Sequence, residues 1–153
     1  MRFIADNMLG TLAKWLRVMG FDTVYAAGLD DGEILRLAQT EDRTVISRDR
    51  ELCSRKPGSV FLETTELDAQ ILSVLALFEP PEDGVLSRCL ECNTVLQEVT
   101  KEEAAGNIPE GVLLRHDGFW KCPDCGRFYW PGTHWQNMMK KAGELTASRN
   151  SPR

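Results

Sequence analysis

Hydrophobic and polar positions follow two different periods in the first half of the chain. Four short apolar runs are rich in β-branched residues and are typical of buried strands. They lie at residues 2–6, 23–26, 44–47 and 59–63. Between and after them, apolar residues recur every three or four positions, which predicts helices. These span residues 8–20, 30–42, 49–55 and 65–78. The repeated order of strand and helix predicts an α/β fold with a mainly parallel sheet flanked by helices.

This periodicity breaks at residues 78–84, "FEPPEDG", where two prolines, three acids and a glycine interrupt the apolar pattern. Such a stretch is typical of a domain boundary. We therefore expect an α/β domain over residues 1–80 and a small second domain over residues 86–139. The polar residues 140–153 predict a disordered tail.

Three acids stand where strands end or helices begin. Asp6 follows the first predicted strand, Asp49 comes one residue after the third, and Asp31 opens the second predicted helix. Ligands of open parallel sheets bind beyond the carboxyl ends of the strands, so these acids are expected to share one crevice. Clustered carboxylates repel one another unless a cation neutralises them, and oxygen ligands suit Mg²⁺ or Mn²⁺. Helix capping is the alternative for Asp31 and Asp49, whereas Asp6 is not expected to cap.

Four of the five cysteines form two C-x2-C pairs. They are Cys89, Cys92, Cys122 and Cys125. In a reducing compartment this spacing indicates a four-thiolate zinc site rather than disulfides. The metal is expected to be structural, because four thiolates leave no position for a reacting water. Iron in a rubredoxin-like site is the alternative. Cys53 has no partner at ligand spacing and is expected to be a buried thiol.

Basic and aromatic residues surround these two motifs. Cations that could contact phosphates are Lys14, Arg17, Arg48, Arg50, Lys121 and Arg127. Their alternative role is solvated surface. Half of the aromatic residues lie around the second cysteine pair, at Phe119, Trp120, Phe128, Tyr129, Trp130 and Trp135. These rings could stack on single-stranded bases or form the core of the small domain.

Net charge and hydropathy set two further limits. The net charge is −5, but its acidic excess falls within residues 57–88, where six acids face one basic residue. Neither end of the chain is therefore excluded from binding a polyanion. The sequence contains no run near 18 apolar residues, and its first residues do not resemble a signal peptide. We expect a cytoplasmic protein.

Several strings resemble the PIN-like ribonuclease domain of the Mut-seven C-terminal RNase family. They are "FIADNMLGTLAKWLRVMGFDT", "DDGEILRLA" and "VISRDREL", followed by "CPDCGRFYWPGTHW", which resembles its closing zinc segment. The resemblance spans about residues 2–139. It implies a PIN-like fold, a divalent-metal ribonuclease and a C-terminal zinc ribbon, with Asp6, Asp31 and Asp49 as its acids. A further acid of PIN domains has no firm counterpart, Asp68 being the nearest candidate.

The hypothesis from sequence is a nuclease that hydrolyses RNA with Mg²⁺ or Mn²⁺ at these three acids. Its zinc ribbon would be structural and would aid RNA binding. The alternative is a non-catalytic adaptor that binds RNA or the ribosome. An adaptor has no need for three carboxylates in one crevice, whereas metal-dependent hydrolysis requires them.

Overall fold

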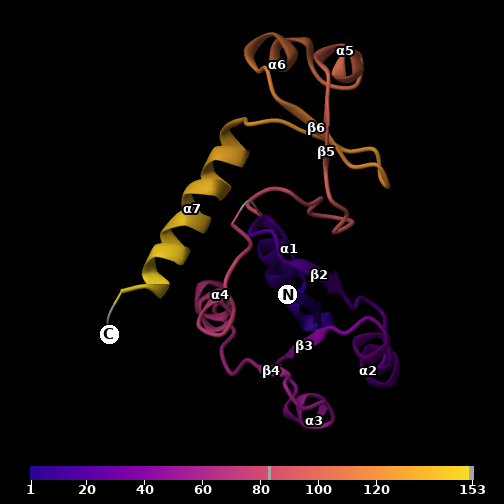
Figure 1. The fold of residues 1–153 in the computed structure, drawn as a ribbon, viewed down its shortest axis with the longest axis vertical. Helices are drawn as coiled ribbons and strands as arrows, with labels where there is room; N and C mark the ends of the chain where they lie inside the picture. Colours follow the sequence, from indigo (N-terminus) through magenta and orange to yellow (C-terminus); the bar gives the residue numbers. More distant parts are fainter. Residues whose placement is uncertain (83, 152–153) are drawn as a thin grey trace.

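A four-stranded parallel sheet forms the centre of the first domain in the computed structural model, which describes residues 1–82 and 84–151. Its order is β2-β1-β3-β4 (Figure 1). The strands are β1 (Arg2–Ala5), β2 (Asp22–Tyr25), β3 (Thr44–Ser47) and β4 (Val60–Phe61). The helices between and after them are the 3-10 turn η1 (Asn7–Leu9), α1 (Gly10–Val18), α2 (Asp31–Thr40), α3 (Arg50–Ser54) and α4 (Leu67–Leu75). The predicted α/β fold is confirmed.

Both faces of the sheet are buried because successive residues of a strand point to opposite sides. On β1, Phe3 packs into a cluster with Leu12 and Leu16 of α1, whereas Ile4 packs on the other face with Ile34 of α2. α4 joins the first cluster and α3 the second. Helix coverage on both sides explains why the strands read as continuous apolar runs.

A smaller antiparallel sheet of order β5-β6-β7 follows the boundary. Its strands are β5 (Gln97–Val99), β6 (Phe119–Lys121) and β7 (Phe128–Tyr129), with the short helices α5 (Lys101–Ala104) and α6 (Glu110–Arg115) inserted between β5 and β6. Figure 1 shows this sheet and its helices apart from the parallel sheet, beyond the C-terminal end of α1. We call residues 86–132 the ribbon. None of the described helices is long and apolar enough to cross a membrane.

The expected disordered tail is instead the second half of a helix, α7 (Thr133–Arg149). Met138, Ala142 and Leu145 are spaced one helical turn apart and are buried in the main core. α7 lies along α4, where Lys141 forms an ion pair with Asp68 at 2.7 Å (Figure 1). The prediction of disorder was wrong here because three buried positions sufficed to anchor a mostly polar helix. Residues 152–153 of the expected tail lie outside the described residues.

The stretch expected to separate two domains is held against the first one. The ring of Phe78 packs edge-on against Phe3 with centroids 5.1 Å apart. Leu86 is buried in the main core, and its N–H donates to the Val18 carbonyl at 2.7 Å. At Gly20, where φ is +89°, an added Cβ would lie 2.4 Å from the Gly84 Cα. The chain therefore turns tightly after α1 and crosses that turn again on its way into the ribbon.

Candidate functional site

Ser47 joins two of the three expected acids at the carboxyl ends of β1 and β3. These strands are neighbours, and the Asp6 N–H donates to the Ile46 carbonyl at 3.0 Å. The buried Ser47 hydroxyl donates to Asp6 Oδ2 at 2.6 Å and accepts the Asp49 N–H at 2.8 Å. One hydroxyl thus orients the first acid and fixes the backbone of the second, so both acids lie at one edge of the sheet. We call this edge the crevice.

Both carboxylates also cap the helices that follow them. Asp49 Oδ1 accepts the N–H groups of Glu51 and Leu52 at 2.8 and 3.2 Å, at the start of α3. Asp6 Oδ1 accepts the Asn7 N–H at 2.6 Å, at the start of η1. The expectation that Asp6 has no capping role was wrong, because η1 begins directly after β1. In each acid, capping occupies Oδ1, and Oδ2 is the oxygen through which a further contact is possible.

Asp31 is held less firmly. Asp30, not Asp31, caps α2, in a reciprocal pair of bonds with Glu33. The Asp31 carboxylate lies 3.6 Å from the guanidinium of Arg55, and half of its side chain is exposed. Within residues 1–82 and 84–151, the acids Asp6, Asp31 and Asp49 do not form a group close enough to hold a metal ion. Asp68, paired with Lys141, is directed to α7 instead.

The basic residues expected to contact RNA differ in their freedom to do so. Arg17 is buried, and its guanidinium donates to the carbonyls of Thr23, Leu90 and Glu91 at 2.8, 2.7 and 3.2 Å. That expectation is corrected for Arg17, whose charge satisfies backbone carbonyls where α1, β2 and the ribbon meet. Lys14 forms an exposed ion pair with Glu91 at 2.8 Å.

The two arginines that flank Asp49 also differ. Arg50 lies over the Phe61 ring at 4.3 Å and forms an exposed ion pair with Glu63. In Arg48, by contrast, Nε is buried and has no hydrogen-bond partner among the described residues. An unpaired buried donor costs free energy, so Arg48 would gain from a side-chain movement that brings this atom to an acceptor.

The four cysteines gather their sulfurs within 4.8 Å of one another, as a metal site requires. Two tight turns with the same hydrogen bonds present them. The Cys89 carbonyl accepts the N–H of Asn93, and the Cys122 carbonyl accepts that of Gly126, both at 2.9 Å. The two donor residues, Asn93 and Gly126, have φ of +68° and +76°, a conformation that suits Asn and Gly. Cys89 and Cys122 are buried, which is typical of a structural site.

Tyr129 contacts the buried side of this cluster. Its hydroxyl lies 3.2 Å from Cys89 Sγ and accepts the Leu90 N–H at 3.2 Å. Burial, together with the neighbouring sulfur, raises the pKa of the Tyr129 hydroxyl, which therefore stays protonated and able to donate. Burial opposes ionisation of Cys89, but hydrogen bonds led by that of Tyr129 lower its pKa to about 7. A sulfur that ionises this readily is a good zinc ligand.

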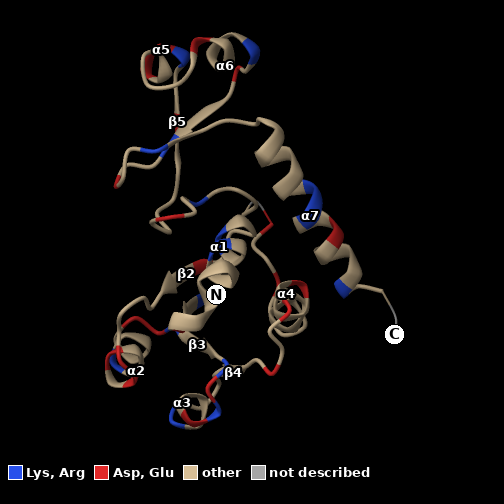
Figure 2. Ribbon diagram, turned by 180° about the vertical axis from the view of Figure 1, so that it is seen from behind, with Lys and Arg blue, Asp and Glu red and all other residues tan. Residues whose placement is uncertain are grey.

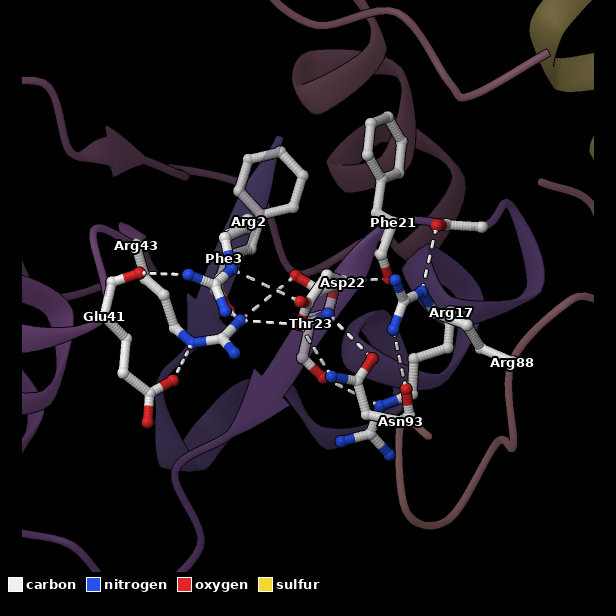
Figure 3. Close-up of polar contacts among 11 residues, drawn as sticks. Arg2, Phe3, Arg17, Phe21, Asp22, Thr23, Glu41, Arg43, Arg88 and Asn93 are labelled. Atoms are coloured by element: carbon white, nitrogen blue, oxygen red, sulfur yellow. Dashed lines mark hydrogen bonds and ion pairs between the residues drawn. The ribbon is translucent and has the colours of Figure 1, made fainter. Parts of the chain in front are cut away.

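A polar network that the sequence analysis missed joins the first cysteine turn to the parallel sheet (Figure 3). Asn93 Nδ2 donates to Asp22 Oδ1 at 2.7 Å, and Asn93 Oδ1 accepts the Thr23 N–H at 2.9 Å. Asp22 also forms an ion pair with the buried Arg43 at 2.7 Å. The available signal was Asn93 itself, which stands where the second cysteine turn has Gly126.

These features correspond to one known family. A family model described as the Mut7-C RNAse domain matches residues 1–142. The chain belongs to the Mut7-C RNase domain family. Membership implies a ribonuclease, and hence a hydrolase whose substrate is RNA. No curated protein and no solved structure matches the chain.

Charge of both signs borders the crevice of this Mut7-C domain. Figure 2 shows acidic and basic residues interspersed over α2 and α3, the helices that begin beside it. Lys121 and Arg127 are exposed on the ribbon, where Lys121 lies 5.4 Å from the centre of the Phe128 ring. The basic residues are therefore spread between the sheet domain and the ribbon.

The aromatic residues of the Mut7-C domain divide between core and surface. Phe119 is fully buried, and Trp120 stacks on Trp135 of α7 with centroids 5.2 Å apart. Phe128 and Trp130 are half-buried and line a cavity of about 370 Å³ between β7 and the start of α7. His134 of α7 lines the same cavity. Only some of these rings are therefore available to a ligand.

Proposed function

We propose that the chain is a divalent-metal-dependent ribonuclease that hydrolyses RNA phosphodiester bonds at the crevice, with Asp6, Asp31 and Asp49 as its acids. The observation that carries the proposal is the bond from Ser47 to Asp6, together with the bond that Ser47 accepts from Asp49. These bonds orient a pair of carboxylates in a chain whose family implies RNA hydrolysis. Capping involves only Oδ1 of Asp6. It does not explain why the buried Ser47 hydroxyl donates to Oδ2.

The donor set suits a hard cation in kind, because it consists of carboxylate oxygens. Mg²⁺ or Mn²⁺ would supply charge neutralisation at the phosphate and a lower pKa for the attacking water. Ser47 holds Asp6 in one orientation, and the start of α3 holds Asp49 through its Oδ1. Asp31 would have to leave its ion pair with Arg55 to join the other two acids in holding a cation, which its exposure permits.

The ribbon has a structural and a binding role in this proposal. Zn²⁺ held by four thiolates has no open position, so the zinc stabilises the ribbon and takes no part in hydrolysis. The ribbon then aids RNA binding through exposed cations, of which Lys121 and Arg127 are the candidates. Both cations are exposed near the half-buried ring of Phe128, and this combination suits a polyanion that carries bases.

Cleavage assays with matched acid variants test this proposal. Purified protein is incubated with structured and unstructured RNAs, with and without Mn²⁺. Wild type and Asp42→Asn should cleave only with Mn²⁺, and Asp6→Asn should not cleave. Asp42 is a fitting control because it is exposed and lies in the turn before β3, at the opposite end of that strand from the crevice. Its φ is +52°, a conformation that Asn tolerates. Cleavage by Asp6→Asn at the wild-type rate would refute the assigned site, and no cleavage by wild type would favour the adaptor.

A further inference from the structure

Four cavities lie in sequence between Arg48, which precedes Asp49 of the crevice, and the ribbon. The first, of about 300 Å³, lies by the start of α1 and includes Thr11 and Arg48. The second, of about 500 Å³, lies between α1 and the end of β2 and includes Thr11 and Glu91. A third, of about 490 Å³, includes Glu91 and Arg127, and it shares Phe128, Trp130 and His134 with the cavity at α7. Each cavity thus shares lining residues with the next.

The residues that link these cavities lie on the surface. Thr11 and Glu91 are exposed, and Thr11 lies one helical turn from Lys14, which lines the second cavity. The shared residues therefore define one groove that runs from Arg48, beside the crevice, past Thr11 of α1 to the ribbon. We call it the α1 groove.

Cations occur at intervals along the α1 groove, where Lys14 is paired with the exposed acid Glu91 at 2.8 Å, and aromatic rings lie at its far end. Arg48, Lys14 and Arg127 line the first, second and third cavities in that order. Arg48 is half-buried, and its Nε has no partner among residues 1–82 and 84–151, so a movement of the side chain would let it donate to a phosphate oxygen. The ribbon end has rings, and flat apolar surface beside cations suits unpaired bases.

We propose that a single RNA strand lies along the α1 groove, with its cleaved phosphate in the crevice and an unpaired base between Phe128 of the ribbon and His134 of α7. This rests on the proposed ribonuclease function. A single strand fits better than a duplex, because bases paired in a helix cannot reach a ring. RNA fits better than a protein segment, because cations at intervals match the repeated charge of a phosphate backbone.

The consequence is a preference for long substrates. RNA of about 4 nucleotides would occupy the crevice alone, whereas RNA of about 12 nucleotides would also reach the ribbon, within the range of single-strand sites. Changes in the ribbon should therefore raise the KM for the long RNA and leave kcat unchanged. The short RNA should be cleaved equally by all ribbon variants.

Two ribbon variants and one matched control test the groove. Arg127→Gln removes a groove cation, Phe128→Leu removes a ring but keeps an apolar side chain, and Arg115→Gln removes an exposed cation of α6 that lines none of the four cavities. KM and kcat are measured in Mn²⁺ for both RNA lengths. Binding of labelled oligouridylate is measured by fluorescence anisotropy without added divalent metal. Zinc content verifies that each ribbon is folded.

Phe128→Leu should weaken binding of the long RNA at least about fivefold, the lower end expected for a lost stacking contact. Arg127→Gln should reduce the slope of log affinity against log salt by about 0.7, as for one lost single-strand phosphate contact. Arg115→Gln should match wild type. Equal effects on both RNA lengths, or none on either, would overturn the groove while cleavage by wild type still supports the ribonuclease. If wild type cleaves neither RNA, the ribonuclease proposal fails, and the binding data alone decide whether the groove holds RNA.

Discussion

Asn93 donates its side-chain N–H to Asp22 at 2.7 Å and so connects the first cysteine turn to the outer strand β2. Oδ1 of Asn93 accepts the Thr23 N–H, a backbone donor on the outer side of β2, where the described residues place no further strand. Buried backbone groups need partners, and here a ribbon residue supplies one. The zinc site and the sheet are therefore coupled through one amide side chain (Figure 3).

Replacing Asn93 with glycine tests this coupling. Glycine adopts the φ of +68° without strain, so the cysteine turn should still bind zinc. The free energy of unfolding should fall by about 1–3 kcal/mol, because Thr23 and Asp22 lose partners in a partly buried place. Urea unfolding and zinc analysis measure the two quantities. Unchanged stability with normal zinc content would show that the two bonds do not couple the ribbon to the sheet.

Asp22 should make the protein sensitive to acid. Burial raises the pKa of this carboxyl, but hydrogen bonds from Arg43 and Asn93 outweigh it and lower the pKa to about 2. A carboxyl with a lowered pKa stabilises the fold at pH values above its unfolded pKa, near 4, and loses this effect as pH falls toward 2. Asp22→Asn should therefore be about 2 kcal/mol less stable at pH 6, and this difference should shrink below pH 4. Urea unfolding of both proteins from pH 6 to 2 measures it, and a constant difference would contradict the assignment.

Ser47→Ala should weaken both stability and cleavage. Removing the hydroxyl leaves Asp6 Oδ2 and the Asp49 N–H without their partner. We expect a loss of about 1–3 kcal/mol in unfolding free energy and, by analogy with residues that orient metal ligands, a 10- to 100-fold slower cleavage. Ser73→Ala is the matched control, because its hydroxyl donates only to a carbonyl within α4. Cleavage by Ser47→Ala at the rate of Ser73→Ala would show that Ser47 does not position the acids.

The zinc ribbon should depend on its metal. Freshly purified protein should contain about one zinc ion per chain, and colourless protein would distinguish zinc from iron. Replacing Cys122 and Cys125 with serine should unfold the ribbon while the parallel sheet persists, since most of the main core lies before the boundary. Tryptophan fluorescence should shift to the red, because Trp120, Trp130 and Trp135 would become exposed. Protein without bound zinc or iron would rule out the metal site.

The elements of the first domain could be predicted because their apolar periodicity is local. Residues 44–47 show no strict alternation of apolar and polar positions, which is typical of a buried strand, and β3 has those bounds. The polar α7 could not be predicted in the same way, because its three buried positions gain their stability only from contact with α4 and α1. Long-range packing, not local propensity, decides such a helix.

The candidate site was predictable to a similar extent. Paired cysteine spacing indicated the zinc cluster, since each pair needs only one local turn. The burial of Arg17 was not visible, because the carbonyls that it bonds belong to β2 and to a segment more than 70 residues away. Ser47 was also missed, because a serine at the end of a strand has no distinctive spacing. Its role depends on the register that places β1 beside β3.

The most direct test of the proposed ribonuclease is Mn²⁺-dependent RNA cleavage by Asp49→Asn beside wild type. Asparagine caps a helix as well as aspartate does, so α3 should persist, but it lacks the charge that holds a divalent cation. The melting temperature of each protein without added metal verifies the fold. We expect cleavage to collapse in Asp49→Asn while its melting temperature is maintained or rises. Equal cleavage by the two proteins would contradict it.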